Sequence, residues 1–230
     1  MVCPAANSVK FPAGALGDSK LPSSKRLNAR WPAAWAGAAS AVVVRAIALT
    51  TTALAAPAQA AGHRAFSRFD DGSFESPKAP AGNFTEFAAG QTIGPWRVTS
   101  GSVDLIGAGM WQAAEGDQAL DLNGNAAGTI AQTFTTVPGA TYSVTYALAG
   151  NPDGGVALRT GRALIDGQDF QDYSFDVTGR TRAAMGYVGR QFSFVAQNSS
   201  TTLAFESTVG GPYGPVLDNV QVKECKSCCG

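Results

Sequence analysis

The stretch TIAQTFTTVPGATYSVTYAL, residues 129–148, decides the fold. Its first part, Thr129–Thr135, alternates polar and apolar residues with the period of a β-strand. Its second part, Thr141–Leu148, places both of its tyrosines and Val144 on one face of an extended chain. Pro138-Gly139 lies between the two parts and is typical of a turn. The sequence therefore predicts two strands here, paired as an antiparallel hairpin.

Further alternating runs follow the same pattern, while helical periodicity is nearly absent after Ala61. Gly, Pro, Asn and Asp residues bound these runs, as expected for short strands that are joined by turns. The predicted strands are Trp96–Val98, Ser102–Ile106, Gln118–Asn123, Tyr173–Val177, Arg190–Ala196, Thr201–Glu206 and Val216–Val222. We therefore expect an all-β protein, an antiparallel β-sandwich of the jelly-roll type, over residues 65–223.

Residues 1–60 have a different composition and resemble a secretory signal with an N-terminal extension. The apolar stretch Ala46–Ala56 follows Arg45 and is too short to span a bilayer. Ala58-Gln59-Ala60 has the small-x-small pattern of a cleavage site. The extension before Arg45 is either a start codon placed too far upstream or a cytoplasmic segment. We expect a secreted, extracellular protein.

The charge balance after residue 60 excludes one class of partner. This part has 11 Lys and Arg against 16 Asp and Glu, a net charge of −5. A mildly acidic domain without a basic cluster is a poor match for nucleic acid, because neutralised phosphates supply most of that affinity. No apolar run after residue 60 is long enough to span a membrane.

Cysteines are confined to the two ends of the chain. None lies between Ala61 and Glu224, whereas Cys225, Cys228 and Cys229 crowd the tail 224–230. The three thiols leave open a disulfide, a disulfide-linked partner or surface, and a tail without a role. Cys225 and Cys228 have the spacing of one half of a zinc site, but the sequence has no second pair of ligands to complete it.

Catalytic signatures are weak. The chain has one histidine, His63, which lies close to the predicted cleavage site. A Ser-His-Asp or Cys-His arrangement is therefore not expected. The densest acidic run, Asp166–Asp176, is typical of a solvated loop that leads into a strand. We expect a protein that is not an enzyme, although carboxylates for a glycosidase pair are plentiful.

A metal site is predicted around Asp218. In Val216–Val222 (VLDNVQV) its side chain shares strand parity with valines, so the carboxylate points to the apolar side and needs a partner. Asp70–Glu75 (DDGSFE) offers further oxygen atoms in a turn before the first strand, and first and last strands are often neighbours. Oxygen ligands alone favour calcium. The alternative is a buried Asp218 that accepts hydrogen bonds from backbone amides.

Six segments together resemble a known family. They are FDDGSFESP (Phe69–Pro77), GPWRVTSGSVDLIG (Gly94–Gly107), WQAAEGDQALDLNGN (Trp111–Asn125), AQTFTTVPGATYSVTYALAGNP (Ala131–Pro152), FDVTG (Phe175–Gly179) and YGPVLDNVQV (Tyr213–Val222). Nearly the whole chain after the signal resembles the choice-of-anchor C proteins. These are secreted bacterial proteins related to the plant cell-wall proteins of domain-of-unknown-function family 642.

This resemblance implies a galactose-binding-like jelly roll, in which a structural calcium commonly ties the first strand to the last. The matching calcium ligands are Glu75 and Asp218. Asp70 occupies a position that is usually Asn in the family, and Asp117 would supply a ligand from the turn Glu115–Gln118. The chain shows no sorting motif or terminal apolar helix, so the resemblance does not imply an anchor.

Such modules bind sugars by stacking aromatic rings on pyranose faces, with a few polar groups for the hydroxyls. The candidates near predicted turns are Trp96, Trp111, Tyr187 and Tyr213. We expect a non-catalytic module that binds a glycan or cell-wall polysaccharide. The alternatives are a surface adhesion protein that recognises other proteins through its loops, and a carboxylate-dependent glycoside hydrolase.

Overall fold

The computed structural model describes residues 69–225, and this part of the chain holds twelve β-strands and no helix. The strands form two six-stranded antiparallel sheets, which we name after a central strand of each. The β12 sheet has the order β1 (Phe84–Ala88), β4 (Ser102–Ile106), β5 (Ala119–Asp121), β12 (Pro215–Glu224), β7 (Thr141–Gly150) and β10 (Val188–Val195). The β11 sheet has the order β2 (Thr92–Ile93), β3 (Trp96–Ser100), β6 (Thr129–Thr135), β11 (Ser200–Ser207), β8 (Leu158–Ile165) and β9 (Gln168–Asp176).

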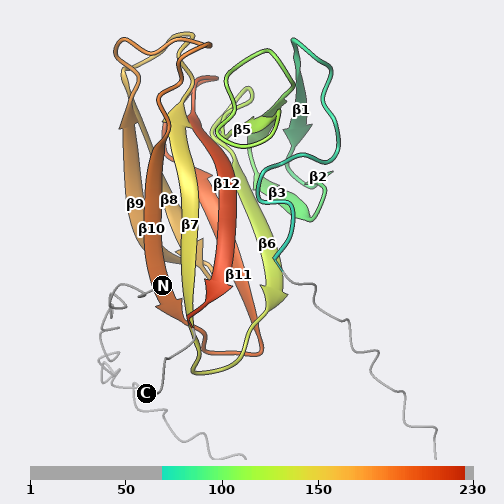
Figure 1. Cartoon of the computed structure of the whole chain (residues 1–230), viewed down its shortest axis with the longest axis vertical. Helices are drawn as coiled ribbons and strands as arrows, with labels where there is room; N and C mark the ends of the chain where they lie inside the picture. Colours follow the sequence, from blue (N-terminus) through green and yellow to red (C-terminus); the bar gives the residue numbers. More distant parts are fainter. Residues whose placement is uncertain (1–68, 226–230) are drawn as a thin grey trace, which may run out of the picture. The chain divides into compact units, whose positions relative to one another are not determined.

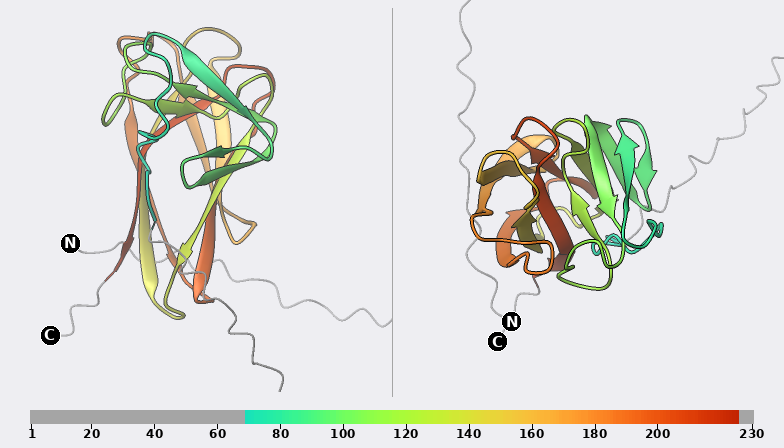
Figure 2. Two further views of the ribbon diagram at one scale, coloured as in Figure 1. Left: turned by 90° about the vertical axis from the view of Figure 1, so that its right-hand side faces the viewer. Right: turned by 90° about the horizontal axis from the view of Figure 1, so that it is seen from above.

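The two sheets face each other and enclose the core (Figures 1 and 2). Because side chains alternate along a strand, one face of each sheet contributes apolar residues to this interior. Tyr146 of β7 and Phe205 of β11 meet across it with ring centroids 5.0 Å apart in an edge-to-face arrangement. The predicted fold class, an antiparallel jelly-roll sandwich, is therefore confirmed.

The predicted hairpin between residues 129 and 148 is wrong, although both of its strands are present. β6 pairs with β3 and β11, whereas β7 pairs with β10 and β12 in the opposite sheet. The turn between them crosses from one sheet to the other, and the amide of Val137 donates to the Tyr142 hydroxyl there at 3.0 Å. Each strand already has a partner on both edges, so no edge is left for a hairpin.

The N-terminal part of the described chain differs from expectation in a second way. No strand begins directly after Asp70–Glu75, because the first strand, β1, starts at Phe84. The segment nevertheless lies against the last strand, because the amide of Val220 donates to the carbonyl of Gly72 at 2.8 Å. Gly72 has no room for a side chain there, since a Cβ would collide with the Val220 carbonyl. The first segment and last strand are thus neighbours without forming a sheet pair.

The strands β8 and β9 form the tight hairpin on which the candidate site is built. Asp166 and Gly167 connect them with φ angles of 51° and 78°. An Asp-Gly pair with two positive φ values matches the twist of antiparallel strands. The acidic run Asp166–Asp176 is therefore a hairpin and its second strand, not a loop that leads into a strand.

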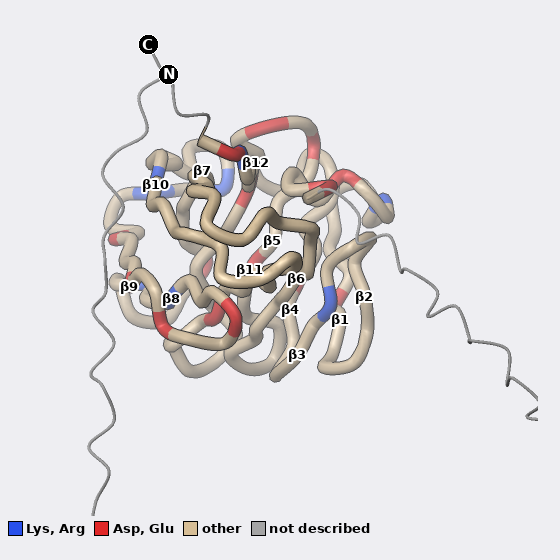
Figure 3. The backbone as a smooth tube through the Cα atoms, turned by 90° about the horizontal axis from the view of Figure 1, so that it is seen from below, with Lys and Arg blue, Asp and Glu red and all other residues tan. Residues whose placement is uncertain are grey.

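Two sequence-based predictions lie outside the described residues. They concern the signal region at 1–60 and the cysteines Cys228 and Cys229. Within residues 69–225, nothing has the length and apolar character of a membrane-crossing helix. Charged residues of both signs are scattered over the described backbone, most of which is uncharged (Figure 3).

Candidate functional site

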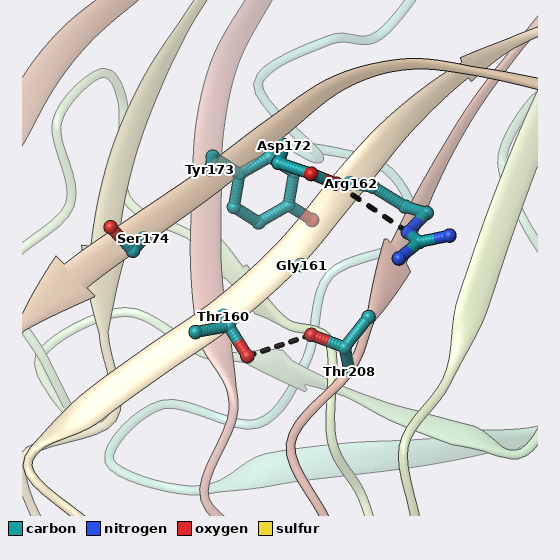
Figure 4. A pocket seen from close by; sticks show the side chains of 7 residues that line it. All are labelled: Thr160, Gly161, Arg162, Asp172, Tyr173, Ser174 and Thr208. Atoms are coloured by element: carbon teal, nitrogen blue, oxygen red, sulfur yellow. Dashed lines mark hydrogen bonds and ion pairs between the residues drawn. The ribbon is translucent and has the colours of Figure 1, made fainter.

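An open hollow of about 340 Å³ lies on the outer face of the β11 sheet. We call it the β8–β9 hollow, because strands β8 and β9 supply most of its lining (Figure 4). Its lining residues are Thr160, Gly161, Arg162, Asp172, Tyr173, Ser174 and Thr208. Hydroxyl, guanidinium and carboxylate groups are therefore all present around this depression.

Three hydroxyl side chains form a row across the hollow. Thr160 of β8 pairs in register with Ser174 of β9, so their side chains share the outer face. On the other side, the hydroxyls of Thr160 and Thr208 lie 2.7 Å apart (Figure 4). The amide of Thr208 also donates to the carbonyl of Thr160 at 3.0 Å, which fixes the backbone beyond the end of β11. The sheet thus holds these hydroxyls in place before any ligand arrives.

Arg162 contributes a directed donor to the same surface. Its Nη1 forms an ion pair with Asp169 Oδ2 at 2.5 Å, and its Nε lies 3.7 Å from Asp172 Oδ1. The Nε atom is buried and makes no hydrogen bond among the described residues. The Arg162 side chain as a whole is 34% exposed and lies beside the exposed Asp172 carboxylate, so the pair can donate to and accept from neighbouring ligand hydroxyls.

Gly161 explains why β8 can carry this depression. The Tyr173 ring lies beneath it, and a Cβ on Gly161 would collide with that ring and with the carbonyl of Glu206. The Tyr173 hydroxyl donates to this same carbonyl at 3.0 Å. Burial, with nearby Tyr146 and Glu206, raises the pKa of Tyr173 well above its usual value. Tyr173 is therefore a neutral structural support under the hollow.

The four aromatic residues predicted to bind sugar do not line the hollow. Trp96 is fully buried among Phe69 and Phe74, and its indole N–H donates to the Asp71 carbonyl at 3.0 Å. Trp111 is 6% exposed. A ring without an open face cannot stack on a sugar, so the prediction for these two tryptophans is wrong.

The two tyrosines are half-buried and stay predictions. The Tyr213 ring packs against Gly154 and Gly155 in the loop after β7. Burial raises the pKa of Tyr187, with smaller contributions from Asp218 and Asp121, and its hydroxyl has no hydrogen-bond partner in residues 69–225. Neither ring lines the β8–β9 hollow.

Among the predicted metal ligands, Asp218 is fully buried and accepts backbone hydrogen bonds. Its Oδ2 accepts from the amides of Ala114 at 2.7 Å and Glu115 at 2.9 Å, and its Oδ1 accepts from Asn219 at 2.6 Å. Burial raises the pKa of Asp218 to about 6, although these amides oppose the rise. The predicted burial of Asp218 is confirmed, and so is its need for partners.

Glu75 accepts hydrogen bonds from the same loop as Asp218, at amides a few residues further along the chain. Its Oε1 accepts from the amides of Asp117 at 2.8 Å and Gln118 at 2.9 Å, while Lys78 approaches Oε2 at 2.5 Å. Partial burial opposes ionisation, but Lys78 and the two amides outweigh it and lower the pKa of Glu75. Asp117 is exposed and has Lys78 at 3.9 Å. Asp70 is held through its backbone, which exchanges two 2.9 Å hydrogen bonds with the Gln132 side chain.

In residues 69–225, no three His, Cys, Asp or Glu side chains come together in a group that could hold a metal ion. The partners of Glu75 and Asp218 are N–H donors and an ammonium group, which are not the surroundings of a calcium ion. The described side chains therefore do not fit the predicted set of calcium ligands. Asp218 instead accepts hydrogen bonds from backbone amides, which is the alternative given above. Calcium binding itself stays a prediction.

No local sequence pattern indicates the polar network around Asp121, which is fully buried in the β12 sheet. Its Oδ1 accepts from the amides of Asn123 at 2.9 Å and Gly214 at 3.2 Å, and its Oδ2 accepts from Asn151 Nδ2 at 2.7 Å. Asn151 in turn accepts from the buried guanidinium of Arg159 through its carbonyl oxygen. Asp121 thus fastens the loops that follow β7 and β11 to the sheet.

The C-terminal cysteines are described only as far as Cys225. Its amide donates to the Thr141 carbonyl at 2.8 Å, which extends the contact between β12 and β7. A disulfide-linked partner stays a prediction, because Cys228 and Cys229 lie outside the described residues.

The fold and the hollow define an all-β jelly-roll domain with a polar depression built on strands. A family match narrows this class: residues 67–223 match the family described as "Protein of unknown function (DUF642)". The chain therefore belongs to that family, as the sequence resemblance implied. The choice-of-anchor C relationship stays a prediction.

One relative is halomucin from Haloquadratum walsbyi, which is 27% identical over 161 residues. The match covers 67% of this chain but only 2% of halomucin.

Similar solved structures include TmCBM61 in complex with β-1,4-galactotriose, with 12% identity and a TM-score of 0.47, covering 69% of this chain and 99% of that one. A second is the CBM22-1 xylan-binding domain from Paenibacillus barcinonensis Xyn10C, with 20% identity and a TM-score of 0.43. The match covers 65% of this chain and 99% of that one. A third is a family 35 carbohydrate-binding module from Clostridium thermocellum, with 13% identity and a TM-score of 0.43 over 62% and 99%.

Proposed function

We propose that this chain is a secreted, non-catalytic module that binds carbohydrate in the β8–β9 hollow. The observation that carries the proposal is the combination of three strand-held hydroxyls with the partly exposed guanidinium of Arg162 and the exposed carboxylate of Asp172. Sugars present neighbouring hydroxyls that both donate and accept, and these side chains supply both kinds of partner.

At the β8–β9 hollow itself, the positions of acidic groups support a binding role over a hydrolytic one. A glycoside hydrolase needs one carboxyl group with a raised pKa opposite a second carboxylate. Burial raises the pKa of Asp104 to about 7, helped by Glu86, and it also raises the pKa values of Asp121 and Asp218. All three belong to strands of the β12 sheet, and none lines the hollow on the β11 sheet.

The proposal is tested by affinity electrophoresis of the full chain in gels that contain galactan, xylan, arabinogalactan or β-glucan. We expect at least one of these neutral polysaccharides to retard the protein. Thr160→Val removes a hydroxyl and keeps the shape, so it should weaken binding about three- to tenfold. The matched control is Thr145→Val on β7 of the opposite sheet, which should bind like the unchanged protein.

Two results would overturn the proposal. One is the absence of retardation by every polysaccharide in the panel. The other is equal binding by the unchanged protein, Thr160→Val and Thr145→Val, because binding would then take place elsewhere.

A further inference from the structure

The register of the β11 sheet places a strip of apolar side chains next to the hollow. Leu164 of β8 pairs with Ala204 of β11, and Ala204 pairs with Ala131 of β6. Paired residues in a sheet share a face, so these three side chains form one row across three strands. Two of the three are alanines, which leaves the row shallow.

A polar row lies on each side of this strip, two residues away along every strand. On the side of the hollow, Arg162 pairs with Glu206 and Glu206 pairs with Thr129. These side chains share the face of the apolar strip, because side chains two residues apart lie on one side of a sheet.

On the far side, the hydroxyls of Thr202 and Thr133 lie 2.8 Å apart. Asp166 continues this row at the hairpin turn, where its Oδ1 accepts from the Thr202 amide at 2.7 Å. With about 3.4 Å per residue, the two polar rows are about 14 Å apart. The surface is thus an apolar strip between two lines of hydrogen-bonding groups.

We infer that this face binds an extended, neutral glycan chain that runs across strands β8, β11 and β6, instead of a single sugar unit. This inference rests on the proposed function. A sugar chain has apolar C–H surfaces along its length and hydroxyl groups at its edges, which match the strip and its two flanking rows. Neighbouring strands are about 4.8 Å apart, so the strip from β8 to β6 is about 10 Å long, and the hollow extends this surface to β9, about 14 Å from β6. One sugar ring cannot cover that length.

Charge favours a neutral chain. Arg162 is surrounded by carboxylates, with Asp169 and Asp172 in ion-pair distance and Glu206 opposite it in register. An anionic sugar would meet these negative groups before it reached the Arg162 guanidinium. The other guanidinium of this face, Arg97, lies at the far end of the strip, where it pairs with Ala131. A neutral hydroxyl instead finds both donors and acceptors.

The inference is tested by calorimetry of the full chain with β-1,4-linked galacto-, xylo- and cello-oligosaccharides of two, four and six units. We expect the tetrasaccharide of the bound series to bind at least tenfold more tightly than the disaccharide. Thr133→Val with Thr202→Val should weaken tetrasaccharide binding about fivefold and leave disaccharide binding unchanged. Thr145→Val serves as the matched control, and melting curves confirm that each variant folds. Oligogalacturonides should bind at least tenfold more weakly than the neutral series.

The outcomes separate this inference from the proposed function. If no neutral oligosaccharide or polysaccharide binds, the proposed function fails. If the disaccharide binds as tightly as the tetrasaccharide, or if the double variant binds both equally well, the extended site is refuted while the hollow stands. Equal or tighter binding of oligogalacturonides refutes the neutral character of the ligand.

Discussion

Glu75 and Asp218 hold opposite ends of one loop segment, although they come from opposite ends of the described chain. Asp218 accepts from the amides of Ala114 and Glu115, and Glu75 accepts from those of Asp117 and Gln118. Backbone N–H groups in a loop have no ladder partners, so the two carboxylates satisfy donors that would otherwise face only water.

Asp218→Asn should lower the free energy of unfolding by about 1–3 kcal/mol, because one amide N–H then faces another donor. Urea denaturation measures this change. Asp117→Asn is the control, since its exposed side chain has only a distant contact with Lys78, and we expect a change within about 0.5 kcal/mol. Equal losses in both variants would contradict the role given to Asp218.

The same pair of variants tests the predicted calcium site. A ligand that binds only the folded state raises its melting temperature. Equal melting temperatures with excess calcium and with chelator would refute the predicted site, because the oxygens of Glu75 and Asp218 already have N–H and ammonium partners. A calcium-dependent rise that disappears in both Asp117→Asn and Asp218→Asn would instead establish the metal.

Stability should fall as the pH rises from 4 towards 7. The folded-state pKa is raised to about 7 for Asp104 and about 6 for Asp218, so the folded protein holds these protons more tightly than the unfolded chain. Their stabilising contribution is complete below the ordinary value of 3.8 and is lost as the pH passes 6 and 7. Glu75, with its lowered pKa, acts in the opposite direction below 4.5.

Urea midpoints measured across this range should therefore peak between about pH 3.8 and 4.5 and decline towards pH 7. Asp104→Asn should flatten the decline on the alkaline side. A urea midpoint that rises steadily from pH 5 to 8 would contradict this prediction, because it would show that ionising Asp104 and Asp218 does not destabilise the fold.

Gly161→Ala should destabilise the fold by about 1–3 kcal/mol or more, because the added methyl group collides with the Tyr173 ring and the Glu206 carbonyl. Thermal unfolding measures the loss. Gly189→Ala is the matched control in β10, where nothing lies within 4 Å of the added atom. A larger loss at position 189 than at 161 would show that the support of the hollow is not as described.

Asp121→Ala should release two loops at once. Three donors lose their acceptor, so we expect a loss of about 3 kcal/mol or more and faster amide hydrogen exchange at Asn123 and Gly214. Asp176→Ala, at an exposed position, should leave both amides protected. Unchanged exchange at Gly214 in Asp121→Ala would refute the fastening role.

Much of the fold could be predicted because alternation is a local property. Ser102–Ile106 matches β4 in both bounds, and the buried position of Asp218 followed from its parity with neighbouring valines. β8 was missed because its inward-facing residues include the charged Arg159 and the side-chain-free Gly161, which obscure the apolar pattern. The false hairpin has the same origin: a turn is visible in the sequence, but the partners of its strands are not.

The candidate site depends on register, which no local pattern contains. Thr160 meets Thr208 only because β11 pairs with β8. Two of the three donors to Asp218, the amides of Ala114 and Glu115, lie more than one hundred positions away in the chain. The buried tryptophans show that a position beside a turn in the sequence does not guarantee an exposed side chain. Trp96 adjoins a turn in the sequence, yet the segment that contains Phe69 and Phe74 folds over it.

The position of β12 has a consequence for how this molecule comes into being. The last described strand lies between β5 and β7, in the middle of its sheet. A nascent polypeptide that still lacks Pro215–Glu224 holds two separate half-sheets with nothing to join them. The domain therefore matures only after its final strand emerges, and a truncation just ahead of Pro215 should yield an aggregation-prone fragment.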